Sequence, residues 1–138
     1  MRTKERIKRT AEIFTPAFLV NEILDKLTEY GPEIWNEEKT FLDPACGNGN
    51  FLIEILKRKL ELWHNPLGAV KTIYGLDIME DNIVECKERL INILKDYTTI
   101  TQDIKNSMDK NIKWLDTTIY PKGTLDYDMS FEWLIFFS

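Results

Sequence analysis

Asp43, Asp77 and Asp116 each stand at the end of a short apolar run, and two glycines, Gly47 and Gly49, follow the first of these aspartates closely. Carboxylates bind the cationic, hydroxyl and amino groups of a ligand, and glycines let the backbone approach that ligand closely. If the three runs are neighbouring parallel strands, the three acids line one crevice at the carboxyl edge of the sheet. A single ligand with three such groups would then account for all of them.

The two glycines are typical of the phosphate-binding turn of a dinucleotide site, but the match is partial. Leu52 occupies the position of the third glycine of that fingerprint, and Asp43 precedes the loop where its charge would repel a pyrophosphate. Two like charges about 4 Å apart repel by roughly 1 to 4 kcal/mol at effective dielectric constants of about 80 to 20. The loop therefore favours a ligand without phosphate groups, and an oxidoreductase that uses a nicotinamide dinucleotide is the weaker alternative.

S-adenosylmethionine offers an ammonium group, ribose hydroxyls and an adenine amino group to the three acids. Three motifs occur in the order Phe14-Thr15-Pro16, then FLDPACGNGNFL from Phe41 to Leu52, then YGLDI from Tyr74 to Ile78. In this order they resemble the adenine-specific DNA methyltransferases of restriction–modification systems. The resemblance extends over residues 10 to 135.

The resemblance implies an α/β fold of the Rossmann-like type found in S-adenosylmethionine-dependent methyltransferases, with a partial parallel sheet and flanking helices. It also implies a role for ten residues. Those expected at the methionine end of the cofactor are Phe14, Thr15, Pro16, Asp43, Ala45, Gly47 and Gly49, with Asp43 as the partner of the ammonium group. Asp77 is expected at the ribose hydroxyls, Ile78 at the adenine face and Asp116 at the adenine amino group.

Methylation of an adenine amino group needs acceptors for its protons and an aromatic face for the flipped base. The family supplies both with an Asn/Asp-Pro-Pro-Tyr/Phe motif after the fourth strand. Here Phe131 to Ile135 is expected to be that strand, and Phe136-Phe137-Ser138 stands where the motif would start. We therefore expect no catalytic residue in this chain and no activity of the chain alone. The alternative is a non-catalytic module that binds S-adenosylmethionine or docks on another subunit.

Large apolar side chains dominate the segment from Phe131 to Phe137. At the edge of a sheet such a strand is a site of aggregation or of partner binding. We therefore expect a second protein subunit or self-association through this strand. DNA is expected as a partner reached through another chain, because no region remains for reading its bases.

The elements that must position the three acids follow from hydrophobic periodicity and from helix start and stop signals. A helix is expected from Thr15 as its cap and Pro16 as its first residue to Gly31. A second is expected to run to Trp63 and to end at Asn65-Pro66-Leu67-Gly68, and a third to carry Ile83 through Tyr97. Strands are expected at Thr40 to Asp43, Thr72 to Asp77, Asn111 to Leu115 and Phe131 to Phe137, and the polar stretch from Thr98 to Lys110 is assigned no element.

Length and composition bound the remaining possibilities. A chain of 138 residues with 43% hydrophobic and 30% charged residues indicates one globular domain. Residues 1–12 are expected to be a basic N-terminal arm, and residues 13–138 the cofactor-binding domain. No apolar run is long enough for a membrane span and no signal peptide is recognisable, so a cytoplasmic location is expected. The two cysteines form no zinc pattern, so no metal is expected, and His64 is expected at the surface at a helix end.

Overall fold

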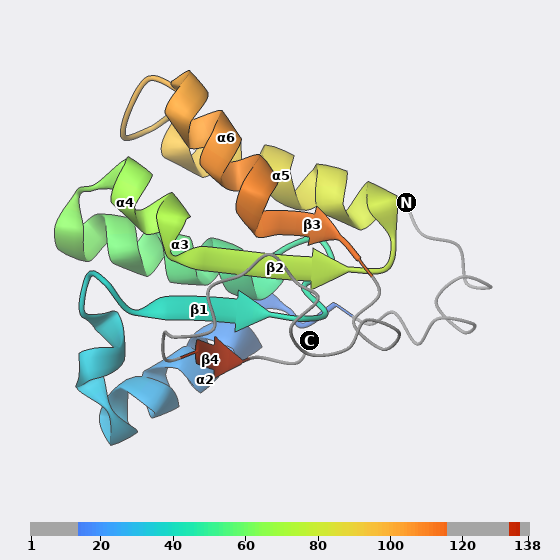
Figure 1. The fold of residues 1–138 in the computed structure, drawn as a ribbon. Helices are drawn as coiled ribbons and strands as arrows, with labels where there is room; N and C mark the ends of the chain where they lie inside the picture. Colours follow the sequence, from blue (N-terminus) through green and yellow to red (C-terminus); the bar gives the residue numbers. More distant parts are fainter. Residues whose placement is uncertain (1–13, 116–132, 136–138) are drawn as a thin grey trace.

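Four parallel strands form one sheet in the order β3-β2-β1-β4 (Figure 1). The computed structural model describes residues 14–115 and 133–135. The strands are β1 (Thr40–Asp43), β2 (Ile73–Asp77), β3 (Ile112–Trp114) and β4 (Trp133–Ile135). In the register of the sheet, Phe41 is aligned with Ile73 of β2 and with Leu134 of β4. Because all four strands run the same way, their carboxyl ends meet at one edge, as the sequence predicts.

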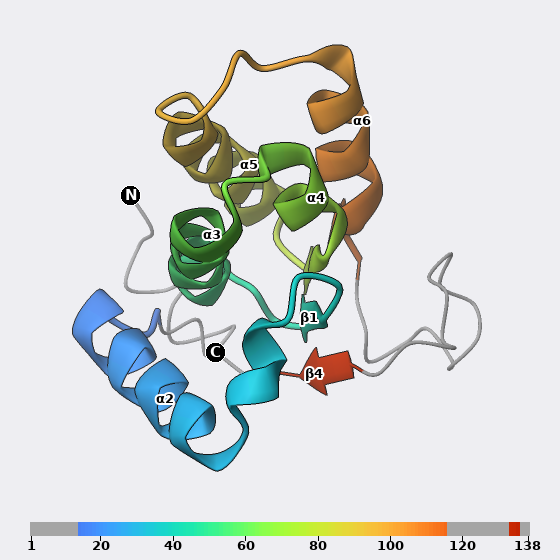
Figure 2. The same ribbon diagram turned by 90° about the vertical axis from the view of Figure 1, so that its left-hand side faces the viewer.

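Helices connect the strands and lie against the sheet. They are α2 (Ala17–Tyr30), the short 3-10 helix η1 (Pro32–Trp35), α3 (Asn50–Trp63), α4 (Pro66–Lys71), α5 (Glu80–Leu94) and α6 (Gln102–Asn111). Figure 2 shows α2, α3 and α5 along the same side of the sheet. The architecture is therefore α/β, with a small parallel sheet and flanking helices, and it is compatible with a Rossmann-like fold.

The side chains of the strands alternate between two unequal apolar layers. Phe41, Ile73 and Ile112 belong to the large core that the helices complete. Leu42 and Leu76, on the opposite face of β1 and β2, form a small separate cluster. This alternation follows from the period of two in a strand. It places Asp43 and Asp77 on the same face as Phe41 and Ile73, where the helices pack.

Three expected helix boundaries differ from the structure, and one of them is the end of α5, which stops at Leu94 and does not reach Tyr97. Pro16 is the residue before the first turn of α2 instead of its first helical residue, and no side chain caps this helix. The segment around Asn65 does not only end α3, because Asn65 caps a new short helix by accepting a hydrogen bond from the amide of Gly68 at 3.1 Å. Helical starts and ends share the residue types Asn, Pro and Gly, so the sequence pattern does not separate the two cases.

Helix α6 is a further difference from the expected elements. It covers most of the polar stretch that precedes β3 and also Asn111, which is expected in the strand, and only Ile104, Met108 and Asn111 of its residues are buried. The hydroxyl of Thr101 caps it by accepting a hydrogen bond from the amide of Ile104. Its apolar stripe is too narrow to stand out from the surrounding polar residues.

Candidate functional site

The chain turns sharply between β1 and α3, and its two glycines make this turn possible. Gly47 and Gly49 have φ angles of 55° and 95°, in the left-handed region that favours glycine. A Cβ at Gly47 would lie 2.7 Å from the ring of Phe14, and one at Gly49 would lie 2.7 Å from Sγ of Cys86. The loop is therefore restricted to glycine at both positions by backbone conformation and by space.

Asp43 ends β1 and is fully buried, with 0% of its surface exposed. Its Oδ1 accepts a hydrogen bond of 3.1 Å from the amide of Ala45, whereas its Oδ2 has no hydrogen-bond partner among the residues that the structure describes. Burial raises the pKa of Asp43 to about 7, the Ala45 bond opposes this shift, and the charge of Asp77 adds to it. A buried acceptor without a donor is costly, so this oxygen is suited to a cationic or N–H group of a ligand.

Asp77 ends β2 and connects three parts of the site. Its Oδ2 accepts a hydrogen bond of 2.9 Å from the amide of Gly47, and its Oδ1 accepts bonds from the amide of Met79 at 2.8 Å and from Nδ2 of Asn82 at 3.1 Å. A carboxylate has about four acceptor positions, so these bonds leave room for roughly one more donor. Asp77 therefore fixes the glycine loop to β2 and α5 and keeps little capacity for a ligand.

The segment from Phe14 to Pro16 lies against the same loop, although it is distant in the sequence. The ring of Phe14 occupies the space that a side chain at Gly47 would need. The carbonyl oxygen of Thr15 accepts a hydrogen bond of 2.6 Å from Nδ2 of Asn50, the first residue of α3. Arg89 of α5 donates to Oδ1 of Asn50 at 2.7 Å. Asn50 and Arg89 thus hold this segment in place; Asn50 lies within the motif from Phe41 to Leu52, but the sequence predicts a role for neither residue.

Two exposed apolar side chains flank the outer end of β2. Ile78, which follows Asp77, is 55% exposed, and Trp114 at the end of β3 is 59% exposed. The indole nitrogen of Trp114 donates a hydrogen bond of 2.7 Å to the carbonyl oxygen of Ile78. The sequence motifs give a role to Ile78 and none to Trp114.

The structure thus brings most of the expected site residues to one edge of the sheet. Phe14, Asp43, Gly47, Gly49 and Asp77 each belong to the glycine loop or contact it or its neighbours. Ala45 and Pro16 are exposed beside these residues in the chain. Asp116 lies outside the described residues, as do residues 1–12 and the ends of the segment from Phe131 to Phe137.

Cys46 lies inside the glycine loop and is buried next to Cys86. Its contact with Cys86 and its burial raise the pKa of the Cys46 thiol well above its ordinary range. A thiol with a raised pKa is a poor nucleophile, so Cys46 acts as a small packing residue. His64 ends α3 at the surface in a left-handed conformation.

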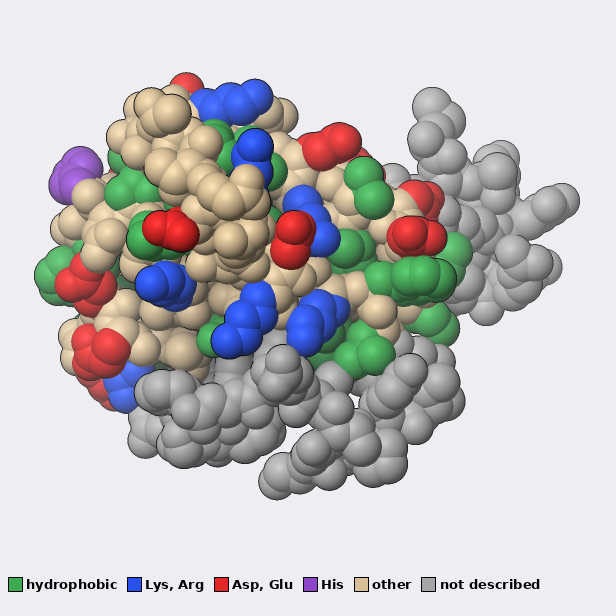
Figure 3. Space-filling model, turned by 45° about the horizontal axis from the view of Figure 1, so that its top comes forward, with side chains coloured by type: hydrophobic (Ala, Val, Ile, Leu, Met, Phe, Trp, Pro, Cys, Tyr) green, Lys and Arg blue, Asp and Glu red, His purple; other side chains and the backbone are tan. Residues whose placement is uncertain are grey.

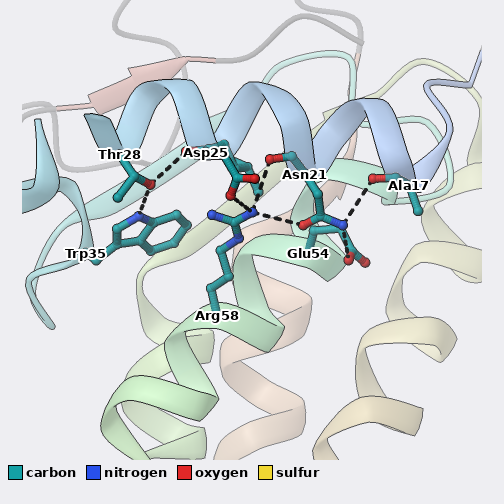
Figure 4. Close-up of polar contacts among 8 residues, drawn as sticks. Ala17, Asn21, Asp25, Thr28, Trp35, Glu54 and Arg58 are labelled. Atoms are coloured by element: carbon teal, nitrogen blue, oxygen red, sulfur yellow. Dashed lines mark hydrogen bonds and ion pairs between the residues drawn. The ribbon is translucent and has the colours of Figure 1, made fainter. Parts of the chain in front are cut away.

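A second polar cluster holds α2 against α3 (Figure 4). Arg58 donates to Oδ1 of Asp25 at 2.7 Å and to Oδ1 of Asn21 at 3.1 Å, and its guanidinium lies 5.6 Å from the ring centre of Trp35. The indole nitrogen of Trp35 donates to Oγ1 of Thr28 at 2.7 Å. Thr28, Trp35 and Arg58 also line an open groove of about 690 Å³. Because these groups satisfy one another, we interpret the cluster as packing that fixes α2 on α3.

No family model and no curated protein matches this chain in sequence comparisons. Within residues 14–115 and 133–135, no group of three or more His, Cys, Asp or Glu side chains is placed to hold a metal ion. In the same part of the chain, every helix is too short or too polar to cross a membrane. The motifs and the geometry of the carboxyl edge are therefore the features from which a function can be inferred.

Proposed function

We propose that this chain is the S-adenosylmethionine-binding part of a DNA adenine-N6 methyltransferase of the restriction–modification type. The observation that carries the proposal is Oδ2 of Asp43, which is buried beside the loop between Gly47 and Gly49 and has no partner among the described residues. The α-ammonium group of S-adenosylmethionine can donate the hydrogen bond that this carboxylate oxygen lacks. The finer fold assignment, a Rossmann-like methyltransferase domain, is part of the same proposal.

The residues around Asp43 are compatible with the remaining parts of this ligand. In the proposal, Phe14, Thr15 and Pro16 lie at the methionine end, together with Ala45 and the two glycines. Asp77 has roughly one acceptor position left, and in the proposal a ribose hydroxyl donates to it. Ile78 takes the adenine face, and Asp116 takes the adenine amino group.

The charges at this edge disfavour the dinucleotide alternative. Asp43 and Asp77 both border the glycine loop, and the charge of Asp77 raises the pKa of Asp43. A pyrophosphate would add negative charge to the same place, whereas an ammonium group would compensate it. The charge balance thus supports a cationic ligand.

Bound S-adenosylmethionine supplies a methyl group activated by its sulfonium. In the proposal, this chain binds and orients the ligand. The Asn/Asp-Pro-Pro-Tyr/Phe motif, which would hold the target adenine, does not occur in the sequence. In the order β3-β2-β1-β4, the fourth strand lies at an edge of the described sheet, where the proposed partner chain could add to it.

Calorimetry with S-adenosylmethionine tests the binding site. We expect a dissociation constant of about micromolar order, a loss of at least about tenfold for Asp43→Asn, and no change for Asp96→Asn at an exposed position of the chain. Adenosine, which lacks the ammonium group, should bind equally to the wild type and to Asp43→Asn. The absence of heat with S-adenosylmethionine, or equal binding by Asp43→Asn, would contradict the proposal.

Methyl transfer tests the second half of the proposal. A chain that carries the Asn-Pro-Pro-Tyr motif is mixed with this protein and with DNA, and transfer of labelled methyl groups to adenine is measured. We expect transfer only when both chains are present. If S-adenosylmethionine binds but no methyl group is transferred with any such partner encoded nearby, the chain is a non-catalytic binding module and not part of a split enzyme.

A further inference from the structure

We propose that Trp114 is a further residue of the cofactor site, and that its indole ring and Ile78 together form the stacking surface for the purine base. This inference rests on the proposed function. It adds a residue for which the motifs give no role.

The position of Trp114 in the sheet places it beside the proposed ribose site. Trp114 is the register partner of Asp77 across the pair of β2 and β3, and the amide of Leu115 donates to the carbonyl oxygen of Asp77 at 2.9 Å. Because Ile112 packs in the main core and side chains alternate along a strand, Trp114 projects on the face that carries Asp77. The indole ring therefore lies next to the acid expected at the ribose.

The exposed surface at this point is apolar and aromatic. The only polar atom of the indole ring already donates to the carbonyl oxygen of Ile78, so the exposed part of Trp114 is an apolar π-face. The side chain of Ile78 is exposed to a similar extent beside it. Figure 3 shows hydrophobic side chains beside acidic ones at the end of the molecule toward which the strands point. A planar base is stabilised by stacking on such a surface, and this stacking does not depend on the identity of the base, because every base has a π-face.

The stacking surface is also rigid. The hydrogen bond between the indole ring and the Ile78 carbonyl joins the end of β3 to the loop that follows β2. Both parts of the stacking surface thus stand on strand ends whose relative position the sheet fixes. A surface held in this way loses little conformational freedom when a ligand binds.

Trp63 provides a matched control for Trp114. Its indole nitrogen also donates to a backbone carbonyl at 2.7 Å, that of Trp35, and its side chain is 44% exposed. It lies at the far end of α3, about 20 Å along the helix from the glycine loop at a rise of about 1.5 Å per residue. Loss of Trp63 should therefore cost packing of the same kind without reaching the proposed site.

Calorimetry with S-adenosylmethionine and with adenosine tests the inference on the whole chain. We expect Trp114→Ala to weaken the binding of both ligands by about tenfold or more, and Trp114→Phe, which keeps an aromatic face, to weaken it by less than about threefold. Trp63→Ala should bind as the wild type does. Thermal unfolding of each variant is measured in parallel. If Trp114→Ala does not fold, Trp114→Phe is compared with the wild type instead.

Tryptophan fluorescence gives a second measurement that a purely structural role would not change. Adenosine should quench the emission of the wild type and of Trp63→Ala, and this quenching should be lost in Trp114→Phe. If Trp114→Ala binds as tightly as the wild type, or if Trp114→Phe is as weak as Trp114→Ala, the stacking role is wrong while the proposed function stands. If the wild type binds neither ligand, the proposed function fails and the inference fails with it.

Discussion

The amide of Gly47 donates a hydrogen bond of 2.9 Å to Oδ2 of Asp77, across thirty positions of sequence. This bond joins the loop that follows β1 to the end of β2. Asp77 also accepts from the amide of Met79 and from Asn82. The carboxylate thus organises the edge of the sheet on which the proposed site depends.

Replacement of Asp77 should therefore destabilise the fold. Asp77→Ala leaves the buried amide of Gly47 and the buried side chain of Asn82 without this acceptor, which costs about 2 to 4 kcal/mol in the free energy of unfolding. Glu88→Gln, at an exposed position of α5, is the control and should change stability by less than about 0.5 kcal/mol. Urea unfolding measures both, and equal stability of the two variants would contradict the organising role of Asp77.

Asp43 should make the stability of the protein fall as the pH rises from about 4 to about 7. Its folded pKa is about 7, against an ordinary value of 3.8, so in this window the folded state holds a proton that the unfolded chain has released. The contribution of Asp43 to the free energy of unfolding is therefore largest below the ordinary pKa of 3.8. Up to about 4 kcal/mol of this stability is lost once the pH rises above the folded pKa of about 7. Asp43→Asn removes this dependence, and its advantage over the wild type should grow between pH 4 and pH 7 in urea titrations. Parallel curves for the two proteins would show that burial does not perturb Asp43.

The same carboxyl group should make the binding of S-adenosylmethionine dependent on pH. An ammonium group pairs with the ionised form, so below about pH 7 binding must first release the Asp43 proton, and affinity should rise about tenfold per pH unit toward pH 7. Adenosine, without an ammonium group, should bind with no such dependence. Calorimetry in buffers of different ionisation enthalpy counts the released proton at pH 6. Uptake of a proton, or no exchange, would be incompatible with an ammonium partner at Asp43.

Alanine variants of two glycines test whether Gly49 is required for its left-handed backbone conformation or is only a turn residue. Gly49→Ala introduces a side chain at a φ of 95° and 2.7 Å from Sγ of the buried Cys86, so it should cost about 1 to 3 kcal/mol of stability. Gly31→Ala is the control, because Gly31 has an extended φ of −154° and the atoms nearest to its new methyl group belong to the flexible carboxylate of Glu33. Thermal unfolding compares the two. Similar losses would show that the loop tolerates a side chain at Gly49.

Strong sequence patterns predict much of this fold, and weak ones do not. The strands from Thr40 to Asp43 and from Ile73 to Asp77 stand out as apolar runs between turn residues, and Gly47 and Gly49 mark the loop between the first strand and α3. Helix α6 escapes prediction, because few of its residues are apolar. These parts differ because sequence periodicity reports burial, and α6 buries little.

The sequence predicts that Asp43, Asp77, Gly47 and Gly49 lie together at one edge of the sheet, as the structure has them, whereas it does not predict the residues that hold them. Asn50 and Arg89 act through bonds to a carbonyl oxygen and to each other, and one sequence does not reveal such contacts, even though Asn50 lies within the motif from Phe41 to Leu52. Trp114 carries no signal either, because its exposure depends on the packing around the end of β3. Residues that act by position can be found only when the fold is known.

Lys59 should give the protein a stability that rises with pH between about 8 and 10.5. Its side chain is 1% exposed on the buried face of α3, and its ammonium group donates to the carbonyl oxygen of Lys39 at 2.8 Å and lies 5.2 Å from the ring centre of Phe41. Burial lowers the pKa of Lys59 to about 8, and the charges of Glu38 and Glu37 oppose this shift. Between about 8 and the ordinary value of 10.5 the unfolded chain holds a proton that the folded state lacks, so stability increases with pH.

Lys59→Met should therefore be more stable than the wild type at pH 7, and this advantage should shrink between pH 8 and pH 10.5. The cost of burying the charge, about 3 kcal/mol, is partly offset by the lost bond to Lys39, so a net gain of about 1 kcal/mol is expected at pH 7. Lys57→Met, at the exposed face of the same helix, is the control and should show no change over this window. Urea unfolding at pH 7, 9 and 10.5 measures all three proteins. A constant difference between Lys59→Met and the wild type would mean that Lys59 keeps its ordinary pKa in the folded state.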